Sequence, residues 1–270
     1  MMLPSDQFSA LIDRILSQHQ YRGLGIPRDT VEDLIQHEAE LGWDKKIIIK
    51  NVRKKMHHLV ANYLGDVEYE QAEKWLDEAY SSQDEGLIKE ACTKIMGFHA
   101  STRERLAHLE NFYQILFAAC GKPESILDLA CGLNPFALPW MNLPQTMQYH
   151  SYDIHSPRIK LINRFFQLEQ RPVVGEVRDV LVNPPDIEAE MAFFFKEAHR
   201  MEQRRKGANR ELWQALKVKT LIVSLPAASL SGQHDLSRQM RQLVETTLSG
   251  LPWKVQELIS GNEIIFCIEK

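Results

Sequence analysis

The chain lacks any apolar run that approaches the ~20 residues needed to span a membrane. Its first residues, Met1 to Arg14, have neither the basic segment nor the apolar segment of a secretory signal. Both absences argue against a membrane protein or an exported one. We therefore expect a cytoplasmic protein that does not associate with membranes, and at 270 residues it is long enough for one large domain or two small ones.

Cysteine is scarce, and the four that occur are far apart: Cys92, Cys120, Cys131 and Cys267. None belongs to a C-x-x-C pair, so the spacing suggests neither a disulfide framework nor a zinc site. We expect reduced thiols and no bound metal.

A large excess of charge of one sign is also missing. The net charge of -4 argues against a protein that coats nucleic acid indiscriminately. The local distribution is uneven, because residues 45–55 contain six lysines and arginines and no acid, whereas residues 66–78 are rich in aspartate and glutamate. Adjacent blocks of opposite sign indicate a local binding face.

Two kinds of pattern divide the chain. Up to about Met96 it predicts only helices, at Ser5 to His19, Thr30 to Leu41, Lys45 to Leu64, Tyr69 to Ser81 and Asp84 to Ile95. After about Ser125, short strand-like runs alternate with helical stretches. These runs are Ser125 to Ala130, Gln148 to Ile154, Pro172 to Val180, Met191 to Lys196, Thr220 to Leu225, Trp253 to Ser260 and Glu263 to Glu269.

Strands that alternate with helices predict an α/β fold with a parallel sheet. Only Gly261-Asn262 separates the last two strands, which predicts a tight hairpin and an antiparallel final strand. Seven strands in this arrangement are typical of Rossmann-like methyltransferases. We expect a helical N-terminal domain, residues 1–96, followed by a methyltransferase domain, residues 97–270.

The helix predicted at Lys45 to Leu64 has an apolar stripe and a basic one. Its apolar positions are Ile49, Val52, Met56, Leu59, Val60 and Tyr63, and Lys46, Lys50, Arg53 and His57 align beside them. The basic stripe is either an ordinary solvated face or a surface that meets nucleic-acid phosphates.

The segment from Asp128 to Phe136, Asp-Leu-Ala-Cys-Gly-Leu-Asn-Pro-Phe, follows a short apolar run. A buried strand that ends in an acid, breaks at one glycine and restarts at Asn134-Pro135 has the form of a nucleotide-cofactor turn. It points to S-adenosylmethionine, whose ammonium group Asp128 could hold. An ordinary strand-to-helix connection is the alternative reading of the turn alone.

Further acids stand at the ends of the next two strands, where ligands bind in such a sheet. Asp153 could accept hydrogen bonds from ribose hydroxyls, and Asp179 is placed for the adenine region. Upstream, Ser101 and Glu104 have the spacing of a capping box, which predicts a helix running to about Ala118. Arg105 in that helix could bind the carboxylate of the cofactor.

No general base is evident among these residues. Asn183-Pro184-Pro185-Asp186 resembles an amine-methylation signature but lacks its aromatic residue, and no cysteine stands at the end of the fourth strand. Guanine N7 has a free lone pair, so its methylation needs positioning alone. We expect no residue in a proton-abstracting role.

The chain resembles the aminoglycoside-resistance 16S rRNA methyltransferases that modify N7 of guanine 1405. The resemblance is carried by His99 to Leu106, Ile126 to Pro139, Asp153-Ile154-His155, Asp179-Val180-Leu181 with Pro184-Pro185, Phe195-Lys196, and Ser224-Leu225-Pro226 followed by Ser229-Leu230. It also extends into the helical half, at Tyr21-Arg22 and Ala61-Asn62-Tyr63.

The resemblance implies binding roles residue by residue. Around S-adenosylmethionine it places Tyr63, His99, Ala100, Ser101, Arg105, Gly132, Asp153, Asp179 and Val180, and we expect Asp128 and Phe195 to join them. On 16S rRNA in the assembled 30S subunit it places Lys46, Lys50, Arg53, Lys54 and Lys196. The implied protein acts as a monomer and reads the shape and phosphates of a folded RNA.

Two segments depart from the family pattern. Glu197-Ala198-His199 follows Lys196 where the family usually has Leu-Leu-Pro, with Arg205 in place of a glutamine farther on, and residues 227–235 lack the usual basic residues. Two alternatives therefore stay open: a methyltransferase for another RNA base or a small molecule, and an RNA-binding module that has lost catalysis.

Overall fold

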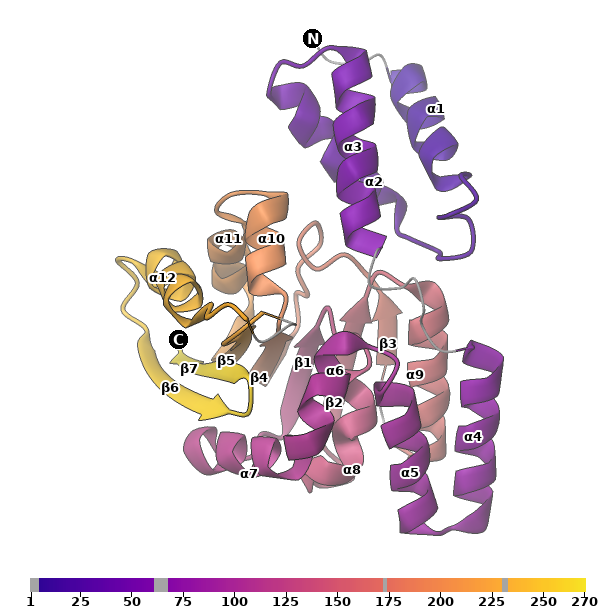
Figure 1. Ribbon diagram of the computed structural model, residues 1–270, viewed down its shortest axis with the longest axis vertical. Helices are drawn as coiled ribbons and strands as arrows, with labels where there is room; N and C mark the ends of the chain where they lie inside the picture. The colour runs from indigo at the N-terminus through magenta and orange to yellow at the C-terminus, as the bar shows by residue number, and fades with distance from the viewer. Residues whose placement is uncertain (1–4, 61–67, 172–173, 230–232) are drawn as a thin grey trace.

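A computed structural model describes residues 5–60, 68–171, 174–229 and 233–270. Its centre is a seven-stranded sheet in the order β3-β2-β1-β4-β5-β7-β6 (Figure 1). The strands are β1 (Ser125–Leu129), β2 (Gln148–Asp153), β3 (Val174–Val177), β4 (Glu188–Phe195), β5 (Lys217–Pro226), β6 (Lys254–Ser260) and β7 (Glu263–Glu269).

The strand directions follow the sequence prediction. Pairs among β1 to β5 are parallel, and β7 runs antiparallel to both β5 and β6. The hairpin predicted at Gly261-Asn262 is confirmed, and it inserts β7 between β5 and β6. The third strand is shorter than predicted, ending at Val177.

Helices cover both faces of the sheet, because alternate strand residues point to opposite faces. In β4, Phe193 and Phe195 pack into one core and Phe194 packs into the other. The first core includes residues of α4 (Tyr69–Ser82), α5 (Glu85–Met96), α7 (Leu109–Cys120), α8 (Leu138–Met141) and α9 (Ser156–Leu168). The second includes residues of α10 (Ala198–Arg204), α11 (Ala208–Ala215) and α12 (Ser237–Leu248).

The first three helices form a separate unit above the carboxyl ends of the strands (Figure 1). They are α1 (Ser5–Leu16), α2 (Arg28–Glu40) and α3 (Lys45–Val60), and their buried side chains make a core of their own. In contrast, α4 and α5 pack into the first core, on one face of the sheet, with α4 against α9. Helices α4 and α5, which lie within the predicted N-terminal domain of residues 1–96, therefore share a core with the sheet and not with α1, α2 and α3.

The cysteine prediction is half right. Cys92 and Cys131 are buried free thiols, but Cys120 and Cys267 form a disulfide with their Cα atoms 6.7 Å apart. Cys120 ends α7 and Cys267 lies in β7, 147 residues later in the chain. Spacing could not reveal this pair, because the fold alone brings that helix end to that strand.

Within the described ranges, no helix combines the length and apolarity that a membrane crossing requires.

Candidate functional site

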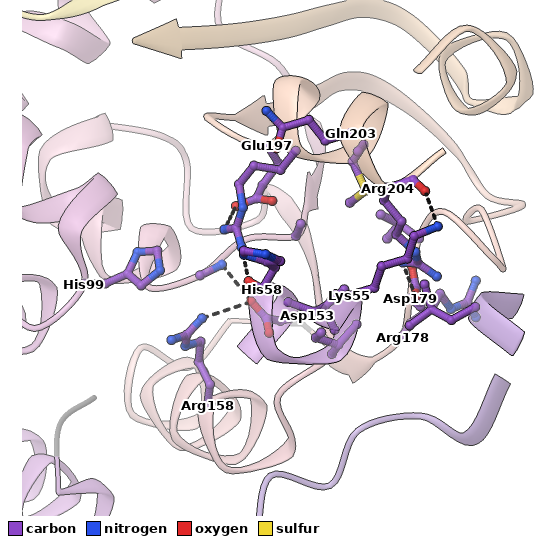
Figure 2. A pocket seen from close by; sticks show the side chains of 18 residues that line it. Lys55, His58, His99, Asp153, Arg158, Arg178, Asp179, Glu197, Gln203 and Arg204 are labelled. Atoms are coloured by element: carbon purple, nitrogen blue, oxygen red, sulfur yellow. Dashed lines mark hydrogen bonds and ion pairs between the residues drawn. The ribbon is translucent and has the colours of Figure 1, made fainter. Parts of the chain in front are cut away.

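A cavity of about 410 Å³ opens at the carboxyl ends of the strands, beneath the three-helix unit. Figure 2 shows the side chains that line it. They come from α2 and α3, from the residue before α6, from the segments after β1, β2, β3 and β4, and from α10. The lining residues used below are Lys55, His58, Leu59, His99, Gly132, Asp153, Arg158, Asp179, Val180, Glu197, Arg200 and Arg204.

The turn after β1 reaches the cavity through two residues with positive φ, Ala130 (50°) and Gly132 (55°). The amide nitrogen of Gly132 donates a hydrogen bond to Asp153 Oδ2 at 3.0 Å. A Cβ at residue 132 would lie 3.4 Å from the His99 ring. The left-handed conformation favours glycine here, whereas a Cβ would make only ordinary van der Waals contact with His99.

Asp153, at the end of β2, lies in the cavity wall with its carboxylate already bound by three donors. Besides Gly132, these are the His155 amide at 2.9 Å to Oδ1 and Arg158 Nη1 at 3.3 Å to Oδ2. An ionised carboxylate has about four acceptor positions. Asp153 therefore keeps roughly one, on Oδ1, for a ligand hydroxyl.

Asp179 is held in the same cavity by a buried arginine. Oδ1 accepts from the Leu181 amide at 3.1 Å, and Oδ2 accepts from Arg204 Nη1 at 2.6 Å. The other end of the Arg204 guanidinium donates to Asp33 of α2 at 2.7 Å. Burial alone would lower the pKa of Arg204, but the two carboxylates raise it above its ordinary value. Arg204 therefore remains charged and joins the sheet to the three-helix unit.

Asp128 and Arg105 lie below the cavity and do not line it. Asp128 Oδ2 accepts from Tyr149 Oη at 2.6 Å and from Asn134 Nδ2 at 2.9 Å, while Arg105 donates to Asn134 Oδ1 at 2.8 Å. Arg105 also makes a two-point ion pair with Glu263, at 3.0 and 2.7 Å. Burial raises the pKa of Asp128 to about 7. In this structure both residues support the turn from beneath.

The helix after His99 does not begin with the predicted capping box. His99 precedes α6 (Ala100–Arg105) and makes no side-chain cap, since its Nδ1 is hydrogen bonded to Ser101 Oγ at 2.7 Å. The helix then tightens into a 3₁₀ turn, Leu106–His108, before α7. Ser101 therefore orients the His99 ring that lines the cavity, and Ala100, which starts the helix, does not line it.

Phe195 and Lys196 are placed differently from the prediction. Phe195 is buried under the Arg105 guanidinium, whose carbon lies 4.6 Å from the ring centre. Lys196 is only 8% exposed, and its Nζ donates to Glu104 at 2.7 Å and lies 3.5 Å from Glu263. The assignment of Lys196 to RNA is corrected accordingly, because two acids hold its ammonium group inside the protein.

The basic residues of α3 are exposed as predicted. We use the term basic ridge for Lys46, Lys50, Arg53 and Lys54, all of which face solvent. On the opposite side the buried residues are Ile48, Val52, Met56 and Val60, so Ile48 replaces the predicted Ile49. Tyr63 lies outside the described residues. Lys55, His58 and Leu59, in the last turns of the same helix, line the cavity.

Sequence reasoning did not assign six charged residues of the cavity to the site: Lys55, Arg158, Arg178, Glu197, Arg200 and Arg204. Arg158 is three residues beyond the recognised His155 and was not singled out. Glu197 and Arg204 lie in the segment that departs from the family pattern, which was the one available signal. No group of three or more His, Cys, Asp or Glu side chains within the described ranges is placed to hold a metal ion.

Comparisons with known proteins agree with this geometry. The ribosomal RNA methyltransferase (FmrO) family matches residues 17–267. A 16S rRNA (guanine(1405)-N(7))-methyltransferase of Micromonospora echinospora is 30% identical over 230 residues, 82% of each chain. A protein of the same name from Serratia marcescens is 30% identical over 260 residues, 95% of this chain and 96% of that one.

Solved structures show the same likeness. The 16S rRNA methylase RmtB superposes with a TM-score of 0.76 at 27% identity, covering 97% of this chain and 98% of its own. The 16S rRNA methyltransferase RmtF, in complex with S-adenosyl-L-homocysteine, superposes with a TM-score of 0.81 at 22% identity, covering 99% and 100%. The predicted methyltransferase fold is confirmed.

Proposed function

Because the chain belongs to the ribosomal RNA methyltransferase (FmrO) family, we propose that it transfers a methyl group from S-adenosylmethionine to N7 of guanine 1405 in 16S rRNA. The substrate is the RNA of the assembled 30S subunit, on which the protein acts as a monomer in the cytoplasm. Methylation at this base would confer aminoglycoside resistance, as in the family that the sequence resembles.

The cavity fits the cofactor. The left-handed glycine turn lets the backbone approach a ligand without a Cβ, and buried carboxylates stand at the ends of two neighbouring strands. We assign to the cofactor the cavity-lining members of the predicted set, His99, Gly132, Asp153, Asp179 and Val180. Asp153 accepts a hydrogen bond from a ribose hydroxyl, and Asp179 with Val180 borders the adenine.

S-adenosylmethionine held by these residues would supply an electrophilic methyl group, and guanine N7 has a free lone pair that can accept it. The protein therefore needs no general base, and its residues act by orientation and by exclusion of water. Leu34, Leu59 and Met201 provide apolar wall to the cavity, which limits solvent around the reacting atoms. The charged residues around them fix the position of the two reactants.

The observation that supports an RNA substrate most directly is the position of α3. This helix carries the exposed basic ridge, and its last turns supply Lys55, His58 and Leu59 to the cavity wall. A phosphate backbone bound along the ridge is thereby brought to the mouth of the cavity. Because phosphate contacts fix register while the pocket selects the base, one helix serves both steps.

The test is transfer of tritium from labelled cofactor to purified 30S subunits, to free 16S rRNA and to 30S subunits carrying adenine at position 1405. We expect label only in the unaltered subunits, with the modified nucleotide mapped to position 1405. Label at another base would favour a retargeted enzyme. Cofactor binding by calorimetry without labelling of any RNA would refute methyl transfer and leave an RNA-binding module.

A further inference from the structure

Glu197 is a cavity carboxylate for which the cofactor assignments have no use. It follows β4 directly and precedes α10, and its side chain is 19% exposed. Figure 2 shows Glu197 among the labelled residues that line the cavity, together with Asp153 and His58.

Only part of the Glu197 carboxylate is engaged. Its Oε1 accepts a hydrogen bond from Arg200 Nη1 at 3.0 Å, and Oε2 accepts none from the described residues. Arg200 in turn donates from Nη2 to the carbonyl oxygen of His58 at 3.0 Å. Burial raises the pKa of Glu197, and the neighbouring Arg200 guanidinium opposes that rise. In its ionised form the carboxylate presents acceptor positions besides the one that Arg200 occupies.

The position of Glu197 separates it from the cofactor residues. In the sheet order β3-β2-β1-β4, Asp179 and Asp153 follow β3 and β2, whereas Glu197 follows β4, on the other side of β1. His58 and Leu59 of α3 line the same cavity, and Arg200 ties this part of it to α3. The cavity beside β4 therefore lies next to the helix that bears the basic ridge.

We propose that Glu197 is the residue that recognises the target base, by accepting hydrogen bonds from the N1–H and the 2-amino group of guanine. The inference rests on the proposed function. Guanine presents these two adjacent donors on its Watson–Crick edge, and a carboxylate matches them with two adjacent acceptors. N7 lies on the opposite side of the ring, so this contact leaves the reacting atom free to face the methyl group.

The same contact rejects adenine. Adenine presents an acceptor at N1 and no amino group at C2, so the lone pairs of Glu197 would face a lone pair of the base. A site built for hydrogen bonding discriminates strongly against a base that leaves its polar groups unpaired. Glu197 thus supplies specificity for guanine, while the hydrogen bond from Arg200 Nη1 orients its carboxylate.

The experiment compares wild-type protein with Glu197→Gln, each saturated with S-adenosylhomocysteine. The affinity for 30S subunits with guanine or adenine at position 1405 is measured by fluorescence titration. We expect the wild type to prefer guanine by roughly tenfold to a hundredfold, as for a two-point base contact. In Glu197→Gln this preference should fall to about twofold or less, and methyl transfer should drop by a similar factor.

Two measurements separate recognition from other roles. Calorimetric affinity for S-adenosylhomocysteine should be unchanged in Glu197→Gln. Glu211→Gln, which removes an exposed carboxylate of α11 paired with Arg205 outside the cavity, should behave as wild type throughout. Glu197→Asp keeps the charge but shortens the side chain, and it should also lose the preference for guanine.

A guanine preference that is unchanged in Glu197→Gln and in Glu197→Asp would overturn the assignment. So would a loss of S-adenosylhomocysteine affinity that accounts for the whole loss of methyl transfer, because Glu197 would then serve the cofactor. If the wild-type protein methylates no guanine of the 30S subunit, the proposed function itself fails. If the wild-type protein methylates guanine 1405 and the two Glu197 variants have the same guanine preference as the wild type, only the role of Glu197 fails.

Discussion

Glu263→Gln should destabilise the protein far more than an equivalent substitution at the surface. Glu263 and Arg105 form a two-point ion pair in which the side chains are 4% and 3% exposed. Gln keeps the shape but removes the charge, so it leaves a buried guanidinium without its counter-ion. Breaking such a pair costs about 3–5 kcal/mol in the free energy of unfolding.

The chain contains a matched control. Arg241 and Glu257 form an ion pair of the same two-point type, with side chains 38% and 34% exposed. Glu257→Gln should cost no more than about 1 kcal/mol, because solvent already screens the pair. Both variants remove a carboxylate from a two-point ion pair with arginine. The difference between their losses in free energy of unfolding therefore measures the effect of burying the pair.

Urea unfolding followed by circular dichroism, at several pH values, tests this reasoning. Burial opposes ionisation of Glu263, but Arg105 and Lys196 lower its pKa below the ordinary value. The stabilisation is therefore present above the unfolded-state pKa and is lost as pH falls through the lower folded-state pKa. Equal destabilisation by Glu263→Gln and Glu257→Gln at neutral pH would refute the argument, as would a cost for Glu263→Gln that does not shrink in acid.

Three further outcomes follow from the site. Burial raises the pKa of Asp128 to about 7, so the wild-type protein should lose stability as pH rises from about 5 to 8 and this carboxyl ionises. Asp128→Asn cannot ionise, and its stability relative to the wild type should therefore increase over this range, as measured by unfolding of both proteins. Gly132→Ala should lower cofactor affinity in calorimetry by about tenfold, whereas Gly250→Ala, also at positive φ but with open space around it, should only cost stability. Replacing three residues of the basic ridge with glutamine should flatten the salt dependence of 30S binding by about three units of slope, with cofactor affinity unchanged.

The sheet was predictable because its signals are local. Strands buried on both faces read as short apolar runs, and the two-residue connection Gly261-Asn262 defined the hairpin. The acids Asp153 and Asp179 were found for the same reason, since each directly follows a strand. A residue at the end of a strand has a position that follows from the fold class alone.

Contacts between distant parts of the chain could not be predicted in this way. The partner of Arg105 is 158 residues away, and Arg204 reaches Asp33 across 171 residues. A guanidinium is long enough to serve either a ligand or a neighbouring carboxylate, and sequence does not say which is nearer. We predicted that Arg105 binds the cofactor carboxylate and that Lys196 contacts RNA. Both side chains instead lie beside the Glu263 carboxylate, whose position the sequence does not reveal.

The core that α4 and α5 join could not be predicted for a related reason. Helices α4 and α5 follow a helical segment in sequence, and periodicity alone cannot tell which core an amphipathic helix joins. Their apolar faces complete the first core, on one face of the sheet, and Leu76 and Ile95 are fully buried there. Only α1, α2 and α3 remain for a separate unit.

The three-helix unit forms part of the cavity wall, through residues of α2 and α3. Arg204 neutralises Asp179 in the cavity and Asp33 of α2 at the same time, so moving α2 away would leave a buried guanidinium only half paired. Such a loss is costly where water cannot replace the missing partner. Lys55 of α3 adds a hydrogen bond to the Arg204 carbonyl oxygen at 3.3 Å. The position of α2 is therefore coupled to the Asp179 carboxylate through Arg204, and under the proposed function RNA that shifts α2 is expected to alter the position of Asp179.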